Sequence, residues 1–369
     1  MQRTTVYAML QALAGAALFG VSTPLAKLLL GQVAPVHMAA LLYLGAGLGI
    51  ALFKGARRLT GRPEAEAPLS RGDLPWLVGA ILAGGVAAPI VLMFSLRRTP
   101  AAAASLLLNF EGVATALLAA LIFREAIGTR VWWAIGAVTT GSILLSWDAS
   151  GGWGVSLGAL GVLAACTLWG VDNNLTRNIS AKDPMAVVMY KGLGAGAFSL
   201  MLGSVAGQPL PSLGIALAVL ALGVVSYGAS IVLYVLALRG LGAARTGALF
   251  GTAPFTGAVL SLVIFRASPG LLFAAAVPLM VAGAVLLLGE RHHHAHAHEA
   301  LDHDHRHRHD DAHHLHTHPG MALHRAHVHP HRHDPITHAH PHVPDIHHRH
   351  RHLRTAAAVP RADSTARYG

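Results

Sequence analysis

Ten stretches of this chain are apolar over about 18 residues, which is long enough for a helix to cross a lipid bilayer. They cover residues 6–30, 35–53, 74–96, 101–123, 131–147, 154–175, 184–206, 213–238, 243–265 and 271–288. Hydrocarbon offers no water to backbone polar groups, so such segments must be helical. Only 12% of all residues are charged, against about a quarter in soluble domains. The sequence therefore predicts an all-α membrane protein with ten transmembrane helices.

The basic residues between these spans predict the orientation of the chain. With the N-terminus in the cytoplasm, the inner segments and span ends carry twelve Lys and Arg residues. The outer ones carry four, namely Lys27, Arg97, Arg98 and Arg266. Cytoplasmic loops of membrane proteins are enriched in these residues. We therefore expect a multi-pass protein of the plasma (inner) membrane with both termini in the cytoplasm.

The two halves of the membrane part resemble each other. YLGAGLG at residues 43–49 matches YKGLGAG at 190–196, and LFGV at 18–21 matches LWGV at 168–171. We expect a first repeat in residues 1–150, a second in 151–290 and a separate tail in 291–369. Five spans per repeat is an odd number, so the second repeat enters the membrane from the opposite side. Inverted repeats of this kind are typical of transporters that work by alternating access.

With these features the chain resembles the EamA family of the drug/metabolite transporter superfamily. The resemblance covers residues 8–289 and rests on the repeats, on the aromatic-Gly-Val motifs and on the FRE sequence at residues 123–125. It implies a ten-helix exporter or permease of the plasma membrane, often for amino acids and other metabolites.

Ionisable residues inside a span are costly and are therefore candidates for function. Glu111 lies in the middle of the fourth span, close to Asn109. It could bind a cationic substrate, carry a coupling proton, or form an ion pair. Lys191, in the seventh span, is its expected partner, either as a switch between two states or as a static lock.

Polar residues also gather where the sixth span ends. Asp172, Asn173 and Asn174 either line the cytoplasmic approach to a substrate site or cap the helix end. Trp169 lines the pathway or is an ordinary packed aromatic residue. The glycines of the two matching motifs are expected to let helices pack closely, as small residues do in membranes.

The tail has a different composition. Between His292 and His352 it holds 25 of the 26 histidines and few large apolar residues, so we expect it to be disordered. Neutral imidazole is a common ligand of Zn, Ni, Co and Cu. The expected metal ligands are His292, His293, His294, His296, His298, His303, His305, His307 and His309. The tail could deliver or sense a metal, buffer it, or have no role.

Three functions follow from the sequence. The first is a secondary transporter of exporter type for small metabolites such as amino acids, which requires no cofactor. The others are a transition-metal efflux carrier that collects ions on its tail, and a metal-responsive sensor without transport. The sequence contains no P-loop and no catalytic triad, so we expect neither an ATP-driven pump nor an enzyme. The expected partners are a small-molecule substrate and the lipid bilayer, not nucleic acid. The sequence does not decide between a monomer and a homodimer.

Overall fold

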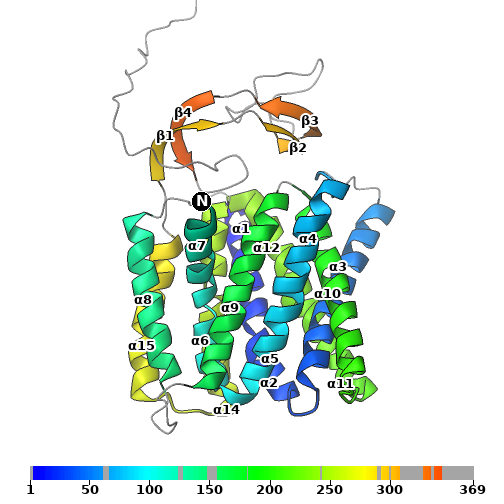
Figure 1. Cartoon of the computed structure of the whole chain (residues 1–369), viewed down its shortest axis with the longest axis vertical. Helices are drawn as coiled ribbons and strands as arrows, with labels where there is room; N and C mark the ends of the chain where they lie inside the picture. The colour runs from blue at the N-terminus through cyan, green and yellow to red at the C-terminus, as the bar shows by residue number, and fades with distance from the viewer. Residues whose placement is uncertain are drawn as a thin grey trace, which may run out of the picture.

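The computed structural model describes residues 3–60, 66–123, 128–147, 156–180, 182–241 and 243–288, and the tail segments 292–298, 301–307, 327–333 and 336–342. Helices form the whole membrane part (Figure 1). In the first half they are α1 (Arg3–Gly20), α2 (Ser22–Leu29), α3 (Pro35–Leu59), η1 (Arg71–Asp73), α4 (Leu74–Ala80), η2 (Ile81–Ala87), α5 (Ala88–Arg98), α6 (Ala101–Leu107), α7 (Phe110–Phe123) and α8 (Thr129–Ser146).

The second half repeats this order. It contains α9 (Leu157–Thr176), η3 (Arg177–Ile179), α10 (Pro184–Val205), α11 (Leu213–Gly223), η4 (Val224–Ala229), α12 (Ser230–Leu241), α13 (Ala243–Phe250), α14 (Ala253–Phe265) and α15 (Leu271–Leu288). The segments η2 and η4 are π-helical and occupy corresponding places in the two halves.

Helix occupies most of each of the ten predicted ranges where they are described, with breaks at Val21, at residues 108–109 and at residues 251–252. Within the described residues, six helical stretches are long and apolar enough to span a membrane, and α14 and α15 are shorter apolar helices. Several helices are interrupted, which shortens the uninterrupted apolar length available to each. A multi-pass helical membrane protein is therefore established, and the number of ten spans stays a prediction.

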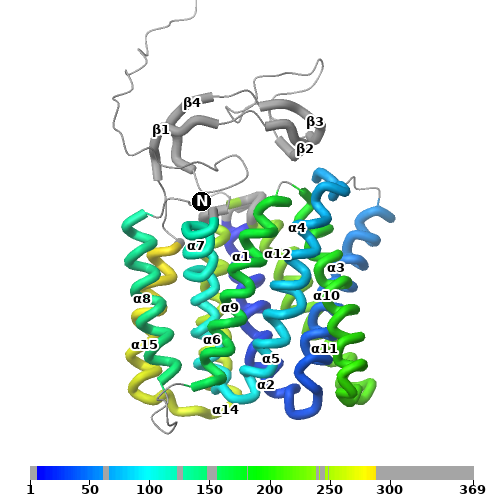
Figure 2. The backbone as a smooth tube through the Cα atoms, in the orientation of Figure 1, coloured from blue at the N-terminus to red at the C-terminus, as the bar shows by residue number. Residues whose placement is uncertain are grey.

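Corresponding helices of the two halves pack against each other. α3 lies on α10 and α8 lies on α15, and these two pairs occupy opposite ends of the bundle (Figures 1 and 2). α1 packs on α12 in the same way that α9 packs on α5. This arrangement is what two similar halves related by a pseudo-twofold axis produce.

The glycine motifs lie where α3 and α10 meet, as the sequence predicts. A side-chain carbon added to Gly47 would lie 2.6 Å from the backbone nitrogen of Leu193. One added to Gly192 would lie 2.7 Å from the backbone nitrogen of Gly47. The absence of side chains therefore allows the two backbones to touch at the interface of the repeats.

We expect Gly47→Ala to destabilise the protein by about 1–3 kcal/mol, the usual cost of overpacking a tight interior. Thermal unfolding in detergent measures this effect. Gly136→Ala is the matched control, because an added carbon there would meet nothing within 4 Å. Equal melting temperatures for the two variants would contradict a tight interface between α3 and α10.

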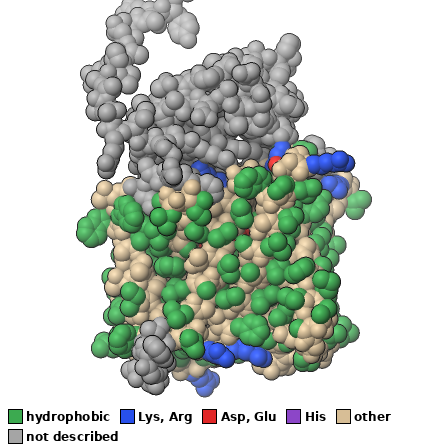
Figure 3. Space-filling view, in the orientation of Figure 1, with side chains coloured by type: hydrophobic (Ala, Val, Ile, Leu, Met, Phe, Trp, Pro, Cys, Tyr) green, Lys and Arg blue, Asp and Glu red, His purple; other side chains and the backbone are tan. Residues whose placement is uncertain are grey.

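The outer surface suits a lipid environment. Hydrophobic side chains cover the visible face, and Lys and Arg side chains gather near its two edges (Figure 3). Large apolar residues such as Leu52, Leu121 and Trp133 are 74%, 76% and 70% exposed. On a soluble protein such a surface would be an aggregation hazard, whereas in a bilayer it faces hydrocarbon.

The interior is packed most densely in one half of the bundle. The main hydrophobic cluster joins the end of α2, the start of α3, the end of α5, α6, the start of α9 and α11. It includes the buried residues Met38, Leu42, Leu96 and Leu107. All these segments lie toward the face opposite the start of α1 (Figure 1). That half of the bundle is closed.

The tail contains four strands, which corrects the prediction of disorder for these segments. They are β1 (His292–His298), β2 (Leu301–His307), β3 (His327–His333) and β4 (Ile336–His342). β1 pairs with β4, and β2 pairs with β3, both antiparallel. The alternating His-x-His sequence has the period of two that a strand needs. The prediction of disorder rested on the lack of a hydrophobic core, which strand pairing does not require.

Candidate functional site

Three interrupted helices meet in the middle of the bundle. α1 and α2 are separated by Val21, α6 and α7 by residues 108–109, and α13 and α14 by residues 251–252. Pro254 occupies the first turn of α14, where a proline needs no backbone partner. Interrupted helices leave backbone groups free, and in transporters they often surround the substrate site.

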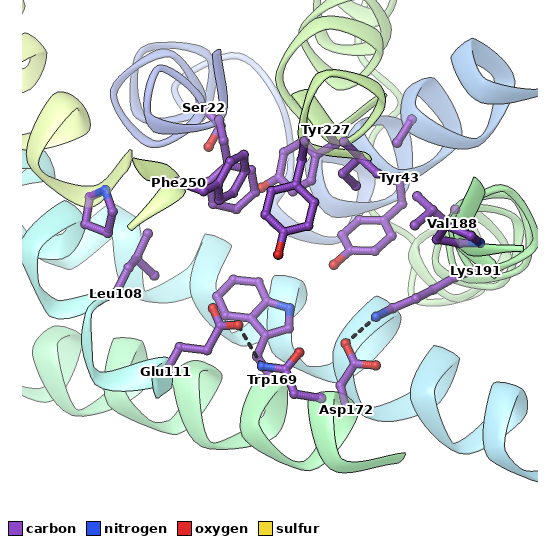
Figure 4. A pocket seen from close by; sticks show the side chains of 18 of the residues that line it. Ser22, Tyr43, Leu108, Glu111, Trp169, Asp172, Val188, Lys191, Tyr227 and Phe250 are labelled. Carbon is purple, nitrogen blue, oxygen red and sulfur yellow. Dashed lines mark hydrogen bonds and ion pairs between the residues drawn. The ribbon is translucent and has the colours of Figure 1, made fainter. Parts of the chain in front are cut away.

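A cavity of about 600 Å³ lies between these breaks (Figure 4). This volume falls within the range of small-molecule sites. Both halves of the chain line it, and most of the lining is apolar or aromatic. The charged side chains in its wall are Glu111, Asp172 and Lys191.

Glu111 lies in the first turn of α7, directly after the break that follows α6. A carboxylate is favoured there because the helix N-terminus carries a partial positive charge. Asn173 on α9 donates a hydrogen bond from Nδ2 to Oε1 of Glu111, with a length of 2.9 Å. Within the described part of the chain, no Lys or Arg forms an ion pair with this carboxylate.

Lys191 pairs with Asp172, not with Glu111, so the predicted partner is wrong in this state. The Lys191 ammonium donates to Oδ2 of Asp172, and Thr176 donates to Oδ1 at 3.0 Å. Asp172 and Lys191 lie on the neighbouring elements α9 and α10, and both line the cavity (Figure 4). The sequence does not show which of the two carboxylates, Glu111 or Asp172, lies nearer to Lys191. In the structure Asp172 does, and it binds the ammonium.

Gly84, inside the π-helical segment η2, links several groups of the site. Its carbonyl accepts hydrogen bonds from the Tyr43 hydroxyl at 2.7 Å and from Nε1 of Trp169 at 2.9 Å. A side-chain carbon at Gly84 would lie 1.9 Å from Oδ2 of Asp172. This glycine therefore positions two aromatic rings and leaves room for the carboxylate.

Aromatic rings form a continuous wall of the cavity. Tyr43 contacts Tyr227 with ring centroids 5.8 Å apart, and Tyr227 contacts Phe19 at 5.4 Å. Phe19 contacts Phe250 at 5.7 Å, and Phe250 contacts Tyr234 at 4.9 Å. We call these five residues the aromatic wall; Trp169 lies across the cavity from it, beside Glu111 and Asp172 (Figure 4).

Five of the seven predicted substrate-site residues line the cavity: Glu111, Lys191, Asp172, Asn173 and Trp169. Asp172 and Asn173, predicted at the cytoplasmic approach, lie in the same cavity wall as Glu111.

Two predicted residues do not line the cavity. Asn109 bonds the Leu106 carbonyl of its own turn at 2.9 Å, and buried Asn174 bonds the carbonyls of Thr115 and Gly170. Amide side chains next to helix ends commonly bond nearby backbone in this way, and this explains both differences.

The cavity extends toward the face where α1 begins. Pro184, the first residue of α10, lines it, as do Tyr234 and Val235 in α12. The opposite half is filled by the main hydrophobic cluster around Met38 and Leu96. The site is therefore near the centre and is closed toward one face.

The predicted metal ligands of the tail are not part of this cavity. His292, His293, His294, His296 and His298 lie in β1, His303, His305 and His307 lie in β2, and His309 is outside the described residues. Among the described side chains, no group of three or more His, Cys, Asp or Glu residues could hold a metal ion.

Comparisons with known proteins agree with the fold. The sequence pattern of the EamA-like transporter family matches residues 6–147 and 156–289. An uncharacterized transporter of Methanothermobacter thermautotrophicus is 30% identical over 266 residues, which are 67% of this chain and 76% of that protein. A crystal structure of a protein shares 24% identity at a TM-score of 0.55 and covers 76% of this chain and 94% of its own, a likeness of fold alone. The chain belongs to the EamA-like transporter family, whose pattern occurs once in each half.

Proposed function

We propose that this protein is a secondary transporter that exports small metabolites bearing an amino group, by alternating access around the central cavity. One observation carries the proposal. Glu111 presents a carboxylate to a cavity of about 600 Å³, and its described partner is the neutral amide of Asn173. A carboxylate inside a membrane needs a cation or a proton, and a bound solute would supply one. Amino acids, which the family resemblance implies, are one class of such solutes.

The closed half of the bundle supports alternating access. The cavity extends toward the N-terminal face, whereas apolar packing blocks the other face. Because the repeats correspond, exchanging their conformations would open the blocked side and close the open one. We propose that ten spans take part in this motion.

The direction of transport follows from the predicted orientation. If the N-terminal face is cytoplasmic, the described state accepts solute from the cytoplasm, as an exporter of the plasma membrane does. Asp172 and Lys191 would hold α9 against α10 while the cavity is loaded.

The test uses the full-length protein in liposomes. Solute counterflow is measured for a panel of radiolabelled amines, amino acids, sugars and organic acids, with protein-free liposomes as the blank. Counterflow of at least one amine or amino acid supports the proposal. Flux of none of the panel, from protein shown to be folded, would contradict transport and favour the sensor.

A second candidate function involves transition metals, and the pairing of the tail strands favours it. Six pairs of histidines lie directly opposite each other: 292–342, 294–340, 296–338, 303–331, 305–329 and 307–327. In each pair of strands, facing histidines recur at every second position of the register. Paired imidazoles suit Zn, Ni, Co or Cu, so we propose that the tail binds such ions for efflux or sensing.

Moving the histidines of β2 by one position, so that they no longer lie opposite those of β3, tests this second candidate. Exchanging the neighbours 302 with 303, 304 with 305 and 306 with 307 keeps the composition but removes three facing pairs. In the full-length protein, equilibrium dialysis with Zn(II) should show affinity lowered at least tenfold. The control exchanges Asp304 with Arg306 and leaves every histidine in place. Equal affinity of the parent and the variant with moved histidines would show that pairing is irrelevant.

A further inference from the structure

We infer that the cavity selects an organic monocation with a flat apolar body, such as an aromatic amine, and rejects the amino acid with the same side chain. This inference rests on the proposed transport function and narrows its substrate class.

The charge of the cavity is the first argument. Its lining carries two carboxylates, Glu111 and Asp172, and one ammonium, Lys191. Asp172 and Lys191 neutralise each other in an ion pair whose side chains are only 5% and 17% exposed. With Glu111 ionised, the cavity therefore has a net charge of −1. A ligand with a single positive charge completes this balance, whereas an anion would face an uncompensated carboxylate.

The aromatic rings are the second argument. Tyr43, Tyr227, Phe19, Phe250 and Tyr234 form the aromatic wall, and Trp169 lies on the other side of the cavity. The faces of such rings attract cations, and Trp and Tyr are the most effective. The rings also provide a flat apolar surface for the body of the solute. A carboxylate and surrounding aromatic rings together are the features that recognise amines and quaternary ammonium ions.

The fixed ion pair is the third argument, because it distinguishes an amine from an amino acid. An α-carboxylate inside the cavity would need a cation, and Lys191 is the one in the lining. That ammonium is already bound to Asp172, whose other oxygen accepts from Thr176. Gly84 also confines this carboxylate, since an added carbon there would overlap it. An amino acid would have to break the pair, whereas an amine leaves it intact.

The test compares three solutes with one ring: tyramine, tyrosine and the neutral 4-ethylphenol. Binding and counterflow are measured with the unmodified full-length protein in liposomes. We expect tyramine to bind and exchange at least tenfold better than tyrosine, and 4-ethylphenol not to compete with it. Tyrosine equal to or better than tyramine would overturn the inference and leave transport standing. The inference also fails if neither tyramine nor tyrosine is exchanged while another solute of the counterflow panel is. If no solute of that panel is exchanged, the transport proposal itself fails.

Asp172→Asn provides a second, independent measurement. It releases Lys191 and leaves one carboxylate and one free ammonium, which suits a zwitterion. We expect the preference for tyramine over tyrosine to fall at least tenfold in this variant, provided that its unfolding temperature shows it to be folded. An unchanged preference in folded protein would contradict the role of the ion pair. If the variant does not fold, the comparison of solutes in the unmodified protein still decides.

Discussion

Glu111→Gln is expected to lower solute flux between tenfold and more than a hundredfold while the protein remains folded. Gln has the same shape and can still accept the 2.9 Å hydrogen bond from Asn173, so the substitution removes chiefly the charge. Hydrogen bonds to charged groups are worth roughly 1.5–3 kcal/mol, which corresponds to this range of affinity. Counterflow in liposomes over a range of pH values measures the loss.

Asp73→Asn is the matched control for this carboxylate. Asp73 caps the short helix η1 at the membrane surface and is not part of the cavity. We expect its flux to stay within twofold of the parent. If Glu111→Gln transports normally at every pH, Glu111 neither binds the solute nor carries a coupling proton, and the site assignment is wrong.

Lys191→Met is expected to have the largest effect on stability. It leaves the Asp172 carboxylate, a residue only 3% exposed, without its cation. Removing one partner of a buried pair costs about 3–5 kcal/mol, and we expect the lower end because Thr176 still donates to the carboxylate. Thermal unfolding in detergent measures this change.

The double variant Asp172→Asn, Lys191→Met separates the pair from its surroundings. It removes both charges and keeps similar shapes, so most of the lost stability should return. A double variant less stable than either single one would show that the two side chains act independently.

The membrane fold could be predicted because one physical constraint dominates it. Hydrocarbon requires long apolar helices, and the helices of the structure fall on the predicted ranges. The role of the glycine motifs in close helix packing was also predicted, because small residues serve helix contacts, but the contact between Gly47 and Gly192 was not. Glu111 was found for a similar reason, as an ionisable residue in an apolar span.

The arrangement of the site could be predicted only in part. Sequence alone does not show that Lys191 lies beside Asp172, because that depends on how α9 and α10 both pack on η2. The aromatic wall was not predicted either: Phe19 and Tyr43 belong to the matching motifs, but Tyr227 and Phe250 look like ordinary apolar residues of their spans. Gly84 acts through its carbonyl and its missing side chain, and both follow from the π-helical turn of η2.

In the tail, the secondary structure differs from the prediction. Its composition, with few large apolar residues, predicts that it builds no core. Strand pairing needs no core, however, and the alternation of His with other residues gives β1 and β4 a common phase. Reading the period as well as the composition would have indicated strands.

Sided labelling of two corresponding cysteines tests alternating access most directly. Val188 lines the cavity on α10, and its counterpart by the matching glycine motifs is Leu41 on α3, which is 8% exposed within the closed half. Cys166 is the only cysteine of the chain, so Cys166→Ala provides a background without thiols. Each position is then changed to Cys and treated with a membrane-impermeant thiol reagent from either face. We predict that Val188→Cys reacts only from the N-terminal face and Leu41→Cys only from the opposite face, with substrate changing the two rates in opposite directions. Reaction of both from the same face would contradict alternation of the two repeats around the cavity.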